Sequence, residues 1–115
     1  MNKTNRSQII RFREAEARIP GPPDAHAISL FQHGTLAIKL SLPVGPNRQT
    51  PHEQDEVYII ARGSGFFVHD GKRDAIESGD AMFVAAGTEH HFEDFTKDFA
   101  VWVLFYGPSG GEVHH

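Results

Sequence analysis

The chain has 115 residues, a formal net charge of −4 and no cysteine. Its length suits one domain with a single core, and the lack of cysteine excludes disulfides, thiolate zinc sites and cysteine nucleophiles. The eleven Lys and Arg residues form no basic stripe of the kind that binds nucleic acid, and no apolar run reaches the roughly 18 residues of a membrane span. We therefore expect a soluble, cytoplasmic protein that binds neither nucleic acid nor membrane.

The N-terminal part of the sequence reads as an arm ahead of the main domain. Gln8–Phe12 can form a short strand, and Arg13–Arg18 has the composition of a brief helical turn. The run Pro20-Gly21-Pro22-Pro23 then ends any regular element. We predict three parts: an N-terminal arm with a Pro-rich connection over residues 1–25, a barrel over 26–107 and a C-terminal tail over 108–115.

From His26 onward the sequence predicts short β-strands separated by turn residues. Phe66–His69 and Asp74–Ile76 flank Asp70-Gly71, a dipeptide typical of type I′ hairpins. The other expected strands cover residues 27–32, 35–42, 52–62, 81–85, 90–93 and 99–106. Many short strands at regular spacing favour an all-β sandwich or barrel.

Alternation along the strand over 35–42 predicts which of its side chains face the core. Lys39 and Ser41 are expected to face outward, because the apolar residues share the other parity. These apolar residues, expected in the core, are Leu36, Ile38, Leu40 and Leu42. The residues that we expect to line the barrel are Tyr58, Phe67, Met82, Phe92, Trp102 and Leu104.

The strand over 52–62 places several polar side chains on one face. Successive side chains of a strand alternate, so this face carries Thr50, His52, Gln54, Glu56 and Tyr58. Polar groups on the inner face of a barrel are costly unless something satisfies them, and a divalent ion between His52 and Glu56 does so. The alternative is that this face is a polar outer surface and that Val57 and Ile59 lie inside.

Two segments of the chain resemble the signature motifs of the cupin superfamily. The residues that match the first motif are His52, Glu56 and Gly63, and those that match the second are Gly79, Gly87 and His90. The resemblance covers about residues 36–106 and is to small single-domain cupins of the cupin 2, conserved-barrel type. It implies an all-β double-stranded β-helix, the cupin jelly-roll barrel, with a short N-terminal arm.

The resemblance also implies a metal site. His52, Glu56 and His90 are then ligands of a divalent transition metal. Two histidines and one carboxylate with open coordination positions favour Fe(II), and Mn(II), Ni(II) and Zn(II) are also suitable. The residue types alone do not choose among these ions.

The fourth ligand position departs from the family pattern, because Thr50 stands where the first histidine of the motif is usual. An amide oxygen is a suitable replacement for hard divalent ions. Strict alternation favours Gln54, whereas a bulge at Pro51 brings Gln49 inward. Resemblance to small cupins with a Gln-x-Pro-His sequence favours Gln49, which we take as the fourth ligand.

For function, the resemblance implies a metal-dependent enzyme that acts on a small oxygen-rich or carbonyl compound, with dioxygenase-like chemistry. The Tyr58 hydroxyl is expected to orient the substrate or a water. The alternatives are a non-catalytic small-ligand binding or sensor cupin, an isomerase or lyase acting on a sugar acid, and a degenerate site in a structural dimer. A homodimer is expected, in which the Ile9–Phe12 segment joins the sheet of the partner.

Overall fold

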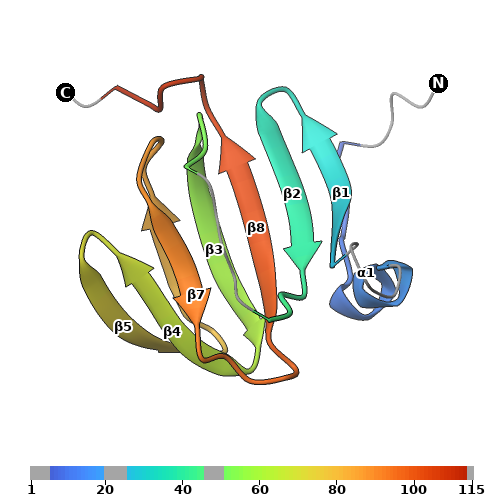
Figure 1. Cartoon of the computed structure of the whole chain (residues 1–115). Helices are drawn as coiled ribbons and strands as arrows, with labels where there is room; N and C mark the ends of the chain where they lie inside the picture. The colour runs from blue at the N-terminus through green and yellow to red at the C-terminus, as the bar shows by residue number, and fades with distance from the viewer. Residues whose placement is uncertain (1–5, 20–25, 46–50, 114–115) are drawn as a thin grey trace.

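The computed structural model describes residues 6–19, 26–45 and 51–113. In these residues one short helix precedes eight β-strands (Figure 1). The elements are α1 (Phe12–Arg18), β1 (Ala27–His33), β2 (Leu36–Ser41), β3 (Asp55–Arg62), β4 (Ser64–His69), β5 (Lys72–Glu77), β6 (Ala81–Val84), β7 (His90–Glu93) and β8 (Ala100–Tyr106). The prediction of an all-β protein is confirmed.

The strands form two antiparallel sheets. A five-stranded sheet has the order β1-β2-β8-β3-β6, and a three-stranded sheet has the order β5-β4-β7 (Figure 1). The chain passes from the first sheet to the second at Gly63, the single residue between β3 and β4. This arrangement confirms the predicted jelly-roll barrel.

The turn between β4 and β5 is the predicted hairpin. Asp70 and Gly71 both have positive φ, 50° and 74°, as a type I′ turn requires at its two central residues. The register pairs His69 with Lys72 directly across the turn. The prediction from the Asp-Gly dipeptide is therefore confirmed.

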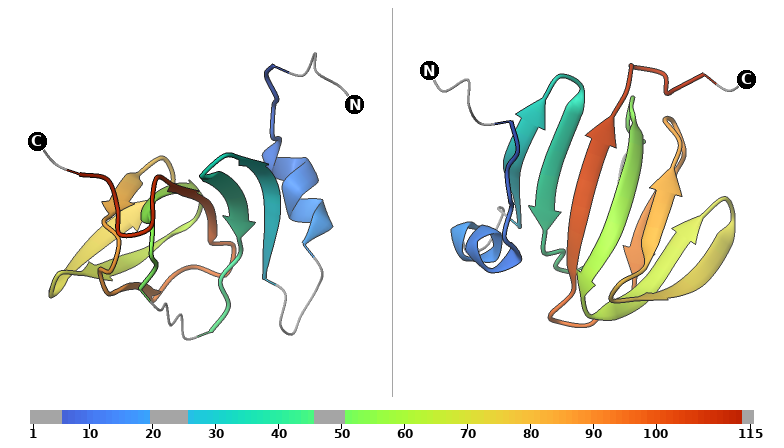
Figure 2. Two further views of the ribbon diagram at one scale, coloured as in Figure 1. Left: turned by 90° about the horizontal axis from the view of Figure 1, so that it is seen from above. Right: turned by 180° about the vertical axis from the view of Figure 1, so that it is seen from behind.

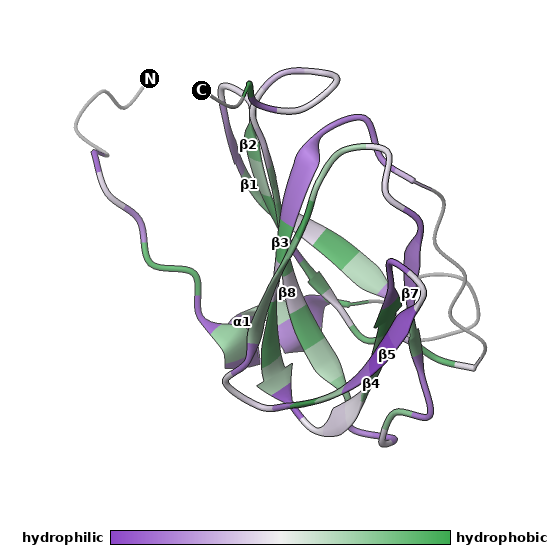
Figure 3. Cartoon of the chain, turned by 90° about the vertical axis from the view of Figure 1, so that its left-hand side faces the viewer, coloured by the Kyte–Doolittle hydropathy of each residue, from purple (hydrophilic) through white to green (hydrophobic). Residues whose placement is uncertain are grey.

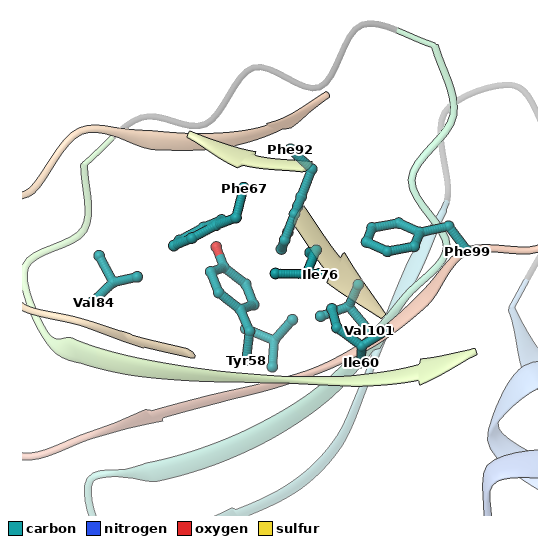
Figure 4. Packing of buried hydrophobic residues seen from close by; sticks show 9 residues of the cluster. Tyr58, Ile60, Phe67, Ile76, Val84, Phe92, Phe99 and Val101 are labelled. Atoms are coloured by element: carbon teal, nitrogen blue, oxygen red, sulfur yellow. The ribbon is translucent and has the colours of Figure 1, made fainter. Parts of the chain in front are cut away.

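The hydrophobic core lies between the two sheets. Figure 4 shows Phe67 and Phe92 packed over Tyr58, which projects from β3. The buried cluster consists of Tyr58, Ile60, Phe67, Ile76, Val84, Phe92, Phe99, Val101 and Val103. Figure 3 shows the contrast between strands: β8 is mostly hydrophobic, whereas β5, at the edge of its sheet, is mostly hydrophilic.

The orientation predicted for β2 is wrong. Leu40 pairs with Trp102, and Trp102 pairs with Ile59, which lies on the opposite face of β3 from the core residue Tyr58. Leu40 is nevertheless fully buried, because helix α1 covers this outer face. By the same register Trp102 and Leu104 face outward rather than into the barrel, and Lys39 and Ser41 face inward.

Helix α1 packs on the outer side of the five-stranded sheet, and in Figure 2 it lies beside β1. The ring of Phe12 meets Trp102 edge-on at 6.1 Å, and Glu16 forms an ion pair with Arg62. The helix confirms the helical turn expected over Arg13–Arg18.

The strand expected over Gln8–Phe12 is wrong, since residues 8–11 have no regular structure and Phe12 begins the helix. Phe12 is held in α1 by its contact with Trp102. The Pro20–Pro23 break lies outside the described residues, and the homodimer stays a prediction. No helix in the part of the chain that the structure describes has the length and apolar character needed to cross a bilayer.

Candidate metal centre

Three side chains from separate parts of the sequence meet at one end of the barrel. His52 precedes β3, Glu56 lies on β3 and His90 begins β7. One ligand atom from each residue lies within 4.8 Å of the others. Two donors that are each about 2.1 Å from one ion are at most about 4.2 Å apart, so donors at the upper end of this spread have to move about 0.6 Å closer to share an ion. The structure therefore brings together the three ligands expected from the sequence, and their binding of a metal stays a prediction.

His52 is positioned by contacts outside a regular strand. The predicted strand over 52–62 begins only at Asp55, so alternation alone does not orient this imidazole. Its carbonyl accepts a hydrogen bond from the Gly87 amide at 2.8 Å, and its ring meets Phe105 edge-on at 4.8 Å. These two contacts fix His52 against the turn that leads to His90.

His90 is held in one orientation by two hydrogen bonds. Its Nδ1 lies 2.8 Å from the carbonyl oxygen of Thr88, which can only accept, so Nδ1 carries a proton. In the neutral ring Nε2 then carries a lone pair, and the Tyr58 hydroxyl donates a hydrogen bond to it at 2.8 Å. Nε2 of His90 also lies 3.3 Å from Oε1 of Glu56. A neutral His90 therefore faces the carboxylate with a lone pair.

The Glu56 carboxylate is the unusual group of the site. Glu56 is 1% exposed, and within the described residues no group donates a hydrogen bond to its Oε1. A buried carboxylate oxygen without a donor is costly, and a cation beside it removes the cost. The donor set of two imidazoles and one carboxylate fits a divalent transition metal.

A proton can occupy the same place when no metal is bound. Burial lowers the pKa of His90, but the facing Glu56 carboxylate and the hydrogen bond to Thr88 outweigh burial and raise that pKa above the ordinary value. The protonated ring can then donate from Nε2 to Glu56. Because a ligating histidine must be deprotonated, protons and metal compete at this site.

The Tyr58 hydroxyl hydrogen-bonds to one of the candidate ligands, His90. Figure 4 shows this hydroxyl pointing from β3 toward Phe67. Burial, followed by the negative charge of the nearby Glu56 carboxylate, raises the pKa of Tyr58 above its usual range. Tyr58 is therefore a hydrogen-bond donor at neutral pH and not a base. Its predicted role in orienting a substrate stays a prediction.

The raised pKa of Tyr58 predicts a loss of stability in alkali. Above pH 10 the unfolded chain releases this proton and the folded chain keeps it. The stability is thus fully present below about pH 10 and falls by up to about 1.4 kcal/mol for each further pH unit. The variant Tyr58→Phe should lack this pH-dependent loss. In urea titrations the unfolding free energy of the variant, relative to that of the wild type, should therefore rise between pH 10 and 11. The same difference in unfolding free energy between the two proteins at pH 10 and pH 11 would contradict this prediction.

Asp55 is a residue of the site that sequence reasoning missed. It is 5% exposed, and its carboxylate accepts hydrogen bonds from the amides of Ala86 and Glu112, each at 2.9 Å. It thereby ties the start of β3 to the turn before His90. Adjacent residues on a strand point to opposite faces, so the side-chain pattern placed Asp55 away from Glu56 and gave no signal of this role.

His69 also lies closer to the site than its turn position suggests. It pairs with His90 in the sheet register, and its ring stacks on Phe67 at 4.8 Å. Its two ring nitrogens meet the carboxylates of Asp70 and Asp74, at 3.2 and 2.8 Å. Residues 68–71 and 88–91 border an open cavity of about 520 Å³.

The fourth ligand expected from the sequence is not placed by the structure. Gln49 and Thr50 lie outside the described residues. The amide nitrogen of Gln54 donates to the carbonyls of Thr35 and Gly107, at 3.1 and 3.0 Å. The simple alternation that favoured Gln54 fails because β3 begins after it. Gln54 instead connects two loops.

Comparison with known proteins agrees with the motifs. Residues 41–106 match the family model of the Cupin domain. An uncharacterized protein of Streptomyces coelicolor is 33% identical over 102 residues, which cover 88% of this chain and 97% of that protein.

Solved structures show the same fold. A cupin 2 conserved barrel domain protein from Salinispora arenicola superposes with a TM-score of 0.67 at 18% identity, covering 90% of this chain and 91% of that one. The DMSP lyase DddQ from Ruegeria pomeroyi superposes with a TM-score of 0.61 at 24% identity over 70% of this chain. The shared part is 46% of the lyase, so this chain matches less than half of its length.

Proposed function

The chain belongs to the cupin family, and from this premise we propose that it is a metal-dependent enzyme acting on a small oxygen-rich or carbonyl compound. In this proposal His52, Glu56 and His90 hold one divalent transition metal. Fe(II), Mn(II), Ni(II) and Zn(II) all suit two imidazoles and one carboxylate. Gln49 stays the proposed fourth ligand, and Tyr58 the proposed substrate-orienting group.

The observation that carries the proposal is the Glu56 carboxylate. Its Oε1 is buried without a hydrogen-bond donor among the described residues, and both neighbouring histidines place a ring nitrogen within 4.8 Å of a carboxylate oxygen of Glu56. A structural cluster would be expected to satisfy each buried polar atom. A carboxylate left open toward two imidazoles supports a cation-binding role.

When bound, the metal would supply Lewis acidity and open positions for a substrate. The residues of the chain do the rest. Tyr58 holds its proton and offers it as a hydrogen bond at the edge of the cavity beside Glu56. Phe67 and Phe92 pack against the ring of Tyr58 and keep water from its inner side. A substrate oxygen can therefore replace Nε2 of His90 as the acceptor of the Tyr58 hydroxyl.

Dioxygenase-like chemistry is the reaction that we favour. Two histidines and one carboxylate with open positions are typical of non-haem Fe(II) oxygenases. A lyase or isomerase acting on a sugar acid is the second candidate. The DMSP lyase with a similar fold supports it, because a barrel of this kind carries lyase chemistry there.

Metal content tests the proposal. Protein purified without chelator or nickel resin should contain about one equivalent of a divalent transition metal by elemental analysis, and His52→Ala should lose it. Oxygen uptake should follow addition of a catechol, a diketone or a sugar acid to the Fe(II)-loaded protein. Metal uptake by His52→Ala equal to that of wild type would overturn the site. Full metal occupancy without oxygen uptake would exclude the oxygenase reaction on those substrates and favour the lyase, isomerase or sensor alternatives.

A further inference from the structure

A small cavity lies on the inner face of the five-stranded sheet, directly beside the candidate metal centre. Its volume is about 150 Å³, well below the roughly 300–1,000 Å³ of pockets that hold drug-sized ligands. The part of a ligand inside it is therefore limited to a few carbon and oxygen atoms. The cavity is lined by Ala27, Lys39, Ser41, His52, Glu56, Tyr58, Val103 and Phe105.

Lys39 is the one lysine in the wall of this cavity. It pairs with Val103, which pairs with Tyr58, so the three residues form one row across β2, β8 and β3. Since neighbouring strands lie about 4.8 Å apart, the Cα atoms of Lys39 and Tyr58 are about 10 Å apart. A lysine side chain and a small ligand together span that distance.

The ammonium group of Lys39 has no ion-pair partner within the described residues, whereas Arg62 and Arg73 both do. Lysine is rarely buried without a partner, and Lys39 is half-buried. The Ser41 hydroxyl lines the same cavity two residues along β2. Side by side on the inner face, a cation and a hydroxyl can each bind one oxygen of an anion.

We propose that this cavity binds a small carboxylate compound, with its carboxylate on Lys39 and Ser41 and its other, oxygen-bearing end toward His52, Glu56 and His90. The inference rests on the proposed function and names the substrate class of that site. A single ammonium group with one hydroxyl suits the two oxygens of a carboxylate.

Charge gives the proposal a second consequence. Lys39 and Glu56 cancel in the empty cavity, and a divalent ion would make it positive by two charges. An anion should therefore bind more tightly to the metal-loaded protein than to the metal-free protein.

Pyruvate and its uncharged methyl ester are suitable probes, because they differ in the carboxylate charge. Affinity is measured by NMR titration of the metal-free and the Zn(II)-loaded protein. In both forms Lys39→Met should weaken pyruvate binding by about 10-fold or more, the value of one charge-assisted hydrogen bond, and should leave methyl pyruvate binding unchanged. Lys39→Arg should retain pyruvate binding. The control Lys72→Met removes an exposed lysine on β5 and should have no effect.

Equal pyruvate affinity of wild type and Lys39→Met would overturn the proposal, and so would equal binding of pyruvate and its ester to wild type. Lys39→Gln gives the same comparison if the methionine variant does not fold. Zn(II) stoichiometry separates the two proposals: loss of pyruvate binding with normal zinc uptake supports the role of Lys39. A wild type that takes up no zinc refutes the metal centre, and the metal-free titration still tests Lys39.

Discussion

Glu56→Gln should abolish metal binding while leaving the barrel folded. Glutamine keeps the shape of the side chain but removes the charge that faces both histidines. Even changes to residues around metal ligands reduce affinity by about 10- to 100-fold, so loss of a ligating carboxylate should cost at least about 100-fold. Isothermal titration with Zn(II) or Mn(II) at pH 8 measures this loss directly.

The same variant should also lose the thermal stabilisation that metal gives. A ligand at 100 times its dissociation constant stabilises the folded state by about 2.7 kcal/mol, which in a domain of this size raises Tm by about 10 °C. The wild type should show this rise and Glu56→Gln should not. The matched control is Glu77→Gln, which changes an exposed glutamate at the end of β5. A metal-induced rise in Glu56→Gln equal to that of the control would refute the assignment of Glu56.

Gly63→Ala should be the most damaging single-methyl change in the barrel. Gly63 has φ +85°, and a Cβ there would meet Thr96 Oγ1 and lie 3.0 Å from the Cα of Phe99. Positive φ costs a non-glycine residue about 1–2 kcal/mol, and forcing an extra methyl into a packed place costs about 1–3 kcal/mol more. We expect a loss of about 3 kcal/mol or more, a fall in Tm of about 12 °C.

The control for this prediction is Gly34→Ala in the turn between β1 and β2. Gly34 also has positive φ, +59°, but a Cβ at that position meets no atom within 4 Å. It should therefore lose only the backbone component, about 1–2 kcal/mol. Urea unfolding of both variants measures the difference. Equal losses would show that the crossing of the chain from β3 to β4 does not depend on close packing at Gly63.

Features set by local chemistry were predictable from the sequence. Asp70-Gly71 forms its turn because both residues tolerate positive φ, a property of the dipeptide itself. The motif spacing likewise predicted that His52, Glu56 and His90 lie together. Backbone preferences of single residues and the spacing of motifs were enough to predict this turn and this cluster.

Features set by long-range packing were not predictable. Lys39 was expected outside because alternation shows two faces of β2 but not which one helix α1 covers. Leu40 is buried beneath that covering, so both faces of the strand are enclosed. His69 was placed by the pairing of β4 with β7, a contact between segments that are distant in sequence. Asp55 braces the ligand turn through backbone amides, which leave no trace in a side-chain pattern.

The strand order has a consequence for how the protein folds. In the five-stranded sheet β8, the most C-terminal of the described strands, lies between β2 and β3. During synthesis β2 and β3 therefore leave the ribosome long before the strand that joins them. Contacts between distant segments form slowly, and unpaired strand edges expose a nascent chain to aggregation. Closure of the barrel, and with it assembly of the cavity wall from β2 to β3, has to wait for the arrival of β8.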